Sequence, residues 1–127
     1  ILLIKAAPTG TYNASVTNVG TPGTGSPTTS NVGTDEVAAS GTYASGGATL
    51  AGFSATLQTS TGCLDFTSPI TFTGATISAS AAIIYNSSRS NKAVAVIDFG
   101  GTITSTAGTF TVNLPAVGAG TSLIRVA

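Results

Sequence analysis

Apolar and polar residues alternate along three stretches of the chain, and this period of two is typical of strands with one buried face. The residues expected on the buried faces are Phe53, Ala55 and Leu57 in the first stretch, Leu64 and Phe66 in the second, and Phe110, Val112 and Leu114 in the third. No stretch has apolar residues at helical spacing for three turns, and Gly, Ser and Thr interrupt every place where a helix could begin. The pattern therefore predicts an all-β protein.

The alternation changes phase within residues 70–85. Ile70 and Phe72 occupy even positions, whereas the apolar residues from Ile77 to Tyr85 occupy odd ones. A slip of one residue turns every later side chain to the opposite face of a strand, so the buried face is kept only if the slip is absorbed locally. We expect a bulge or bend at Gly74-Ala75.

Residues 93–99, AVAVIDF, are apolar on both faces, which predicts a central strand or one covered by a neighbour. Gly-containing turns are expected between short strands, at residues 8–10, 45–47, 61–62, 100–101, 107–108 and 118–120. Short strands separated by such turns indicate a single antiparallel β-sandwich or barrel-like domain, of the jelly-roll or tulip-like kind, over residues 1–127.

Residues 17–34, TNVGTPGTGSPTTSNVGT, differ from the rest because they contain no large apolar residue. The tetrapeptide NVGT occurs at 18–21 and again at 31–34, which indicates chance or a small local duplication, since a solenoid needs at least three repeats. We expect an extended arm or long loop here. Either an arm that orders on a neighbouring subunit or a plain surface loop fits this composition.

The chain is unusually poor in charge. Four Lys or Arg balance four Asp or Glu, and charged residues make up 6% of the sequence, against about 25% in an ordinary domain. A surface hydrated by neutral hydroxyls, with net charge near zero, favours association over dispersal. The basic residues form no stripe that could follow a phosphate backbone, so nucleic acid is not an expected partner.

The residue types needed for catalysis are sparse. Histidine is absent, which removes the usual general base and any metal site built from Cys and His. Cys63 is the only cysteine, so no intrachain disulfide can form, and we expect it to be a small buried hydrophobe. The sequence predicts no enzyme, no metal site and no cofactor.

The four carboxylates do not form an obvious pair for acid–base chemistry. Asp35 and Glu36 are adjacent and would point to opposite faces of a strand. Asp65 is expected on the solvent face of its strand. Asp98 is expected to pair with a base or to cap the turn at residues 100–101.

Two segments are candidates for contact with a partner. Arg89 and Lys92 lie in a polar patch, NSSRSNK, between two apolar stretches; they either solvate a hairpin loop or face an acidic patch on a partner. The opening ILLI is too short for a membrane span or a signal-peptide core, and it reads as a core strand or an intersubunit strand. The candidate interface residues are Ile1, Leu2, Leu3, Ile4, Arg89 and Lys92.

Several segments between residues 34 and 115 together resemble small virion proteins of tailed bacteriophages. These segments are TDEV at 34–37, GTY at 41–43, GG at 46–47, the stretch 81–88 that ends in IIYNSS, and NKAVAVIDFG at 91–100. Motifs of this kind indicate lineage more than activity.

The resemblance implies a structural protein of the virion, and most closely a capsid decoration or cement protein. Such a protein would be an all-β knob on the capsid surface, bound to the outside of the major capsid protein shell as a homotrimer, with no role at a membrane. Two alternatives stay open: a neck or tail component, including a tail module that binds host glycan, and a pilus or bacterial surface subunit in which ILLI is a donated strand.

Overall fold

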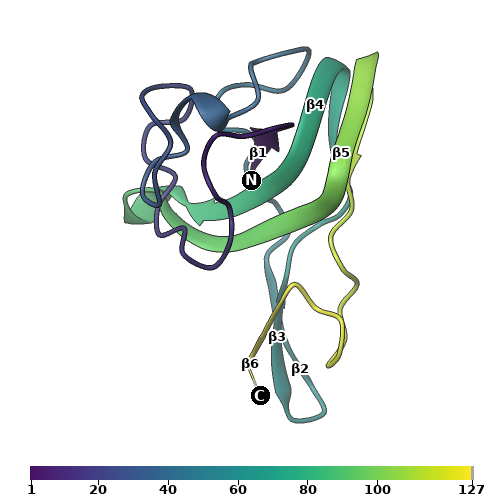
Figure 1. The fold of residues 1–127 in the computed structure, drawn as a ribbon. Coiled ribbons are helices and arrows are strands. Elements are labelled where there is room, and N and C mark those ends of the chain that lie inside the picture. Colours follow the sequence, from purple (N-terminus) through teal and green to yellow (C-terminus); the bar gives the residue numbers. More distant parts are fainter. Residues whose placement is uncertain (127) are drawn as a thin grey trace. The chain divides into compact units, whose positions relative to one another are not determined.

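The computed structural model describes residues 1–126, and its regular structure is almost entirely β (Figure 1). The elements are β1 (Leu2–Lys5), the 3-10 helix η1 (Gly33–Asp35), β2 (Ser54–Gln58), β3 (Thr61–Asp65), β4 (Ile70–Asn86), the 3-10 helix η2 (Ser87–Arg89), β5 (Lys92–Val112) and β6 (Ile124–Val126). They form two three-stranded sheets, β1-β4-β5 and β2-β3-β6. The predicted all-β class is confirmed. No helix within residues 1–126 is long and apolar enough to cross a membrane.

Where the sequence predicts one domain over residues 1–127, the contacts divide the chain into two compact units. Unit 1 comprises Ile1–Ala48 and Phe72–Phe110, and unit 2 comprises Thr49–Thr71 and Thr111–Ala127. Each unit contains one of the two sheets, although β4 and β5 extend a few residues into unit 2. Unit 1 carries the features that bear on function.

The N-terminal strand β1 lies in the core of unit 1. It pairs antiparallel with β4, with Leu2 opposite Ile83 and Leu3 opposite Ala82. The side chains of Ile1, Leu2, Leu3 and Ile4 are at most 4% exposed. Burying four such side chains stabilises the fold by several kcal/mol, at roughly 1.5–3 kcal/mol each. Of the two roles that the sequence left open, burial supports the core strand, and these side chains are not available to a partner.

The predicted change of phase in β4 is confirmed. Phe72 is buried at an even position, and Ala75 and Ile77 are buried at odd ones. Gly74 lies between them with φ +60°, a left-handed conformation that glycine adopts without steric cost. The glycine therefore keeps one face of a 17-residue strand directed at the core.

The strand β5 matches one of its two predicted positions but differs from its prediction in length. It lies at the edge of its sheet with only β4 as a strand neighbour, so it is not central. It is covered by a neighbour instead, because Ala93 and Val96 pack against the core cluster that contains Val16 and Val19. The turns expected at 100–101 and 107–108 are wrong, because β5 runs through both positions. Gly100 and Ala107 take positive φ values of 72° and 47° inside the strand, which bends the backbone without ending the pairing.

The segment 17–34 is a folded loop of unit 1, not an arm that waits for a neighbour. Val19 and Val32 are fully buried, and the Val32 N–H donates to the Val19 carbonyl at 3.0 Å. The two NVGT copies share one local structure: the Asn side chain accepts from the N–H of the Gly two residues later, and that Gly has positive φ. The repeat thus supplies two similar turns that each bury a valine.

In unit 2 the predicted strands form, but two of their faces are assigned wrongly. Phe53 and Leu57, expected in the core, are 63% and 73% exposed. Asp65, expected in solvent, is buried on the same face of β3 as Cys63. The period of two is correct, but the phase follows Cys63 rather than the bulkier Leu64. The expected turn at residues 61–62 lies at 59–60 instead. At the end of β5 and just after it, Phe110, Val112 and Leu114 are buried as predicted.

Candidate functional site

The turn that joins β4 to β5 carries the two cationic candidates of the sequence. Arg89 is the last residue of η2 and Lys92 the first residue of β5, and both are exposed. The turn begins with a local cap, because the Asn86 side chain accepts from the Ser88 N–H at 3.1 Å. It therefore has a defined shape and is not a frayed loop tip.

Contacts with the loop around the first NVGT copy fix this turn further. Asn18 Nδ2 donates to the Ser90 carbonyl at 2.6 Å, and Asn91 Nδ2 donates to the Gly20 carbonyl at 3.0 Å. The Val19 N–H also donates to the Asn91 carbonyl at 3.0 Å. We call this arrangement the tethered turn, residues 86–92. Because its backbone is already ordered, the tethered turn would lose little backbone conformational entropy when a partner binds Arg89 and Lys92.

The buried carboxylate of Asp35 organises the loop at residues 9–12, which precedes the segment that contacts the tethered turn. Its oxygens accept hydrogen bonds from the Thr9 and Gly10 N–H groups at 2.7–3.0 Å and from the Tyr12 hydroxyl at 2.9 Å. Lys5 Nζ lies 3.0 Å from Oδ1. Burial alone would raise the pKa of Asp35, but the donors from Gly10, Thr9, Lys5 and Tyr12 outweigh it and lower the pKa to about 2.

Glu36, the next residue, organises a different loop. Its carboxylate accepts from the Tyr43 hydroxyl at 3.1 Å, the Ser45 hydroxyl at 2.8 Å and the Gly46 N–H. The Tyr43 hydroxyl in turn accepts from the Leu3 N–H at 2.9 Å, so Glu36 is linked to β1. Burial, with the charge of Glu36, raises the pKa of Tyr43 above its usual value. The two carboxylates do point in different directions, but from the end of η1 and not from a strand.

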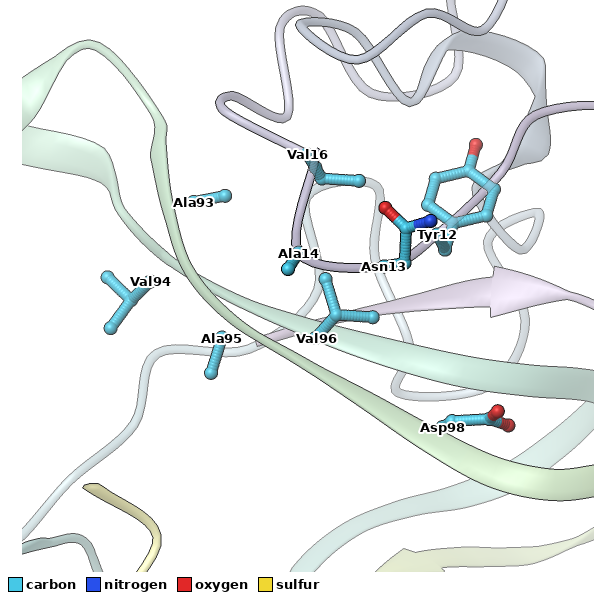
Figure 2. Close-up of a pocket in the computed structure, with 9 residues that line it drawn as sticks. All are labelled: Tyr12, Asn13, Ala14, Val16, Ala93, Val94, Ala95, Val96 and Asp98. Atoms are coloured by element: carbon cyan, nitrogen blue, oxygen red, sulfur yellow. The ribbon is translucent and has the colours of Figure 1, made fainter. Parts of the chain in front are cut away.

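An open groove lies beside the tethered turn, between the loop at residues 12–16 and the first half of β5 (Figure 2). Its volume is about 510 Å³. The lining residues are Tyr12, Asn13, Ala14, Val16, Ala93, Val94, Ala95, Val96 and Asp98. Figure 2 shows Ala93 and Asp98 toward opposite ends of the β5 wall. The lining is mainly apolar, and Asp98 is its one charged group.

The sequence-derived candidates thus separate into two places. Arg89 and Lys92 lie together on the tethered turn, whereas Leu2 to Ile4 belong to core strand β1 and Ile1 is buried just before it. Asp98 acts as the sequence predicts at the glycine pair, since its Oδ1 accepts from the Gly100 N–H at 2.8 Å, although this happens within a strand. Among residues 1–126 no group of three His, Cys, Asp or Glu side chains could hold a metal ion.

Sequence reasoning missed the organising roles of Asp35 and Glu36 and the groove. The signal for the first was present, because a chain with only four acidic residues places two of them side by side. Buried carboxylates are found where they accept several hydrogen bonds, and turn-rich segments such as 8–10 and 45–47 offer free N–H groups. The groove left no signal in the sequence, since its two walls are about 80 residues apart.

Neither a protein-family model, nor a curated protein, nor a solved structure matches this chain.

Proposed function

We propose that this protein is a non-enzymatic structural component of a tailed-bacteriophage virion, which binds the outside of the capsid shell as a decoration protein and stabilises it. The observation that carries the proposal is the tethered turn, which presents Arg89 and Lys92 in solvent on an ordered backbone. The segments that resemble phage virion proteins, residues 81–88 and 91–100, cover the strands on both sides of this turn and all of the turn except Arg89 and Ser90. An acidic patch on the major capsid protein is the partner that this surface fits.

The surface around the turn suits attachment to a larger particle. Exposed residues of unit 1 are mostly neutral, and β5 presents Val94 and Ile103 at 52% and 48% exposure. A long edge strand with exposed apolar residues and few charges favours association with another chain. This supports a protein that works within an assembly, and the homotrimer expected of a decoration protein remains part of the proposal.

Labelled antibody raised against this chain and applied to purified particles of the phage that encodes it tests the location. Label distributed over the whole shell supports a decoration protein. Label confined to one vertex or to the tail, or absent from the particle, contradicts the proposal and favours the neck, tail or surface-subunit alternatives.

Charge reversal tests the contact itself. Arg89→Glu and Lys92→Glu should each reduce occupancy on heads stripped of the protein, while unfolding free energy changes by less than about 0.5 kcal/mol, as is usual for exposed positions. Arg125→Glu is the matched control, because it reverses one exposed cation elsewhere in the chain. Equal occupancy for all three variants and the unmodified protein would contradict a role for the tethered turn.

A further inference from the structure

We propose that the groove between residues 12–16 and β5 is a strand-addition site, which binds a short extended segment of a partner protein carrying one lysine or arginine. The proposal does not depend on where the protein is located. It rests on the free backbone edge of β5, the wall that faces this edge, and the position of Asp98.

The groove follows the free edge of β5. Residues 93 to 96 line it together with the loop at 12–16. Strand β5 has only β4 as a strand neighbour, and residues 17–19 pair with residues 91–93 on its other edge. Because the loop at 12–16 immediately precedes this pairing, the groove runs along the edge of β5 that faces away from β4.

The hydrogen-bonding groups on that edge are open beyond Ala93. The Ala93 N–H points to the outer side, where it donates to the Thr17 carbonyl at 3.1 Å. Ala93 and Val96 both pack against the same core cluster, so the alternation of β5 shifts by one residue between them. Past Ala93, no backbone group of residues 12–16 forms a hydrogen bond with β5 within residues 1–126, so the outward N–H and C=O groups of this stretch are not satisfied by the loop. An extended peptide would satisfy them by adding a fourth strand.

The length of the groove limits the size of the segment that it can bind. Pairing between Thr17 and Ala93 closes the groove at one end, and Asp98 lies at the other. Five residue steps from Ala93 to Asp98 span roughly 17 Å at about 3.3 Å per residue. This length accommodates about five residues of extended chain. The loop at 12–16 stands where a second sheet would have to approach, so a single extended segment fits better than a second copy of β5.

The charge that lines the groove indicates the chemistry of the segment. Asp98 is exposed, and one of its oxygens accepts from the Gly100 N–H, which leaves the other oxygen for a ligand. The other lining residues are uncharged. The complementary segment therefore has small apolar or hydroxyl side chains along the groove and one cation near Asp98.

The test uses the full ¹⁵N-labelled chain and two acetylated, amidated pentapeptides, Ala-Val-Thr-Val-Lys and its reverse Lys-Val-Thr-Val-Ala, which cover both strand directions. We expect amide shift changes confined to residues 12–16 and 93–99 with at least one of them. The same peptide N-methylated at alternate residues should not bind, because it lacks the donors of an added strand. Asp98→Asn should weaken binding at least threefold, and this loss should vanish when alanine replaces the peptide lysine.

Proline is tolerated in an edge strand only where the N–H that it removes points outward, so Ala95→Pro and Val96→Pro are compared. The variant that keeps its β-sheet circular dichroism should lose peptide binding. The proposal is overturned if neither peptide shifts the named residues, or if the N-methylated peptide binds equally well. It is also overturned if analytical ultracentrifugation shows a self-associated chain that this proline variant converts to monomer, because a second copy then occupies the edge.

Discussion

Replacing Asp35 with asparagine should destabilise unit 1 in a way that depends on pH. The carboxylate is fully buried, accepts hydrogen bonds from Thr9, Gly10 and Tyr12 and forms a salt bridge with Lys5. Asparagine has nearly the same shape, but its amide nitrogen cannot accept from these donors and its charge is zero. Donors that faced a carboxylate oxygen would then face an N–H group.

The magnitude follows from the pKa of Asp35, which the fold lowers from 3.8 to about 2. At about 1.4 kcal/mol per pH unit, this difference corresponds to roughly 2.5 kcal/mol of folding free energy. Because the folded-state pKa is depressed, the contribution is fully present above pH 4 and is lost as the pH falls from about 4 to about 2. The asparagine variant should lack this contribution at every pH.

Urea unfolding followed by circular dichroism, at several pH values between 2 and 7, measures the effect. The stability gap between the unmodified protein and Asp35→Asn should be roughly 2–3 kcal/mol at pH 7 and should shrink steadily below pH 4. Asp98→Asn is the control, since Asp98 is exposed and should change stability by less than about 0.5 kcal/mol. A gap below about 0.5 kcal/mol at pH 7, or a gap of constant size down to pH 2, would refute the reasoning.

Three further substitutions test other parts of the fold by the same urea assay. Tyr43→Phe should lower the free energy of unfolding by about 1–3 kcal/mol, because the Leu3 N–H of β1 and the Glu36 carboxylate both lose their hydrogen bond to the Tyr43 hydroxyl. An unchanged free energy of unfolding would show that this hydroxyl is dispensable. Asp65→Asn should raise stability by about 1 kcal/mol, because both oxygens of Asp65 are buried without a hydrogen-bond partner among residues 1–126; destabilisation would contradict this. Gly33→Ala should cost more than Gly74→Ala, since both have positive φ but only at Gly33 would the new Cβ lie 2.2 Å from a backbone oxygen. For Gly74→Ala we expect about 1–2 kcal/mol, and equal costs would show that the loop relaxes.

The sequence predicts strands well where a period of two has to match one continuous core. The phase change at Gly74 is the clearest case, because a buried face can be kept on both sides of it only by a local bulge. The faces of β2 and β3 could not be predicted in the same way. Short strands of a small three-stranded sheet leave one side uncovered, so Leu57 remains exposed although its alternation is regular.

Glycine misled the prediction of turns for a related reason. Gly100 and Gly101 follow the apolar stretch that ends at Phe99, and a Gly-Gly pair at the end of such a stretch ordinarily predicts a turn. Their partner strand β4 is long enough to keep pairing past this point, and the positive φ of Gly100 is absorbed as a bend within β5. Whether a glycine ends a strand or bends it is decided by the neighbouring strand, which single-sequence reasoning does not place.

The zero net charge of the chain conceals an uneven surface. Three of its four acidic side chains are buried: Asp35, Glu36 and Asp65. Three of its four basic side chains are exposed: Arg89, Lys92 and Arg125. Because Asp35 and Glu36 are buried under the loops that they organise, the exposed charges of unit 1 are mainly Arg89 and Lys92, with one exposed acid at Asp98. The carboxylates that hold these loops in place therefore do not offset the cations of the tethered turn at the surface, so a partner of this turn should be acidic even though the sequence as a whole is neutral.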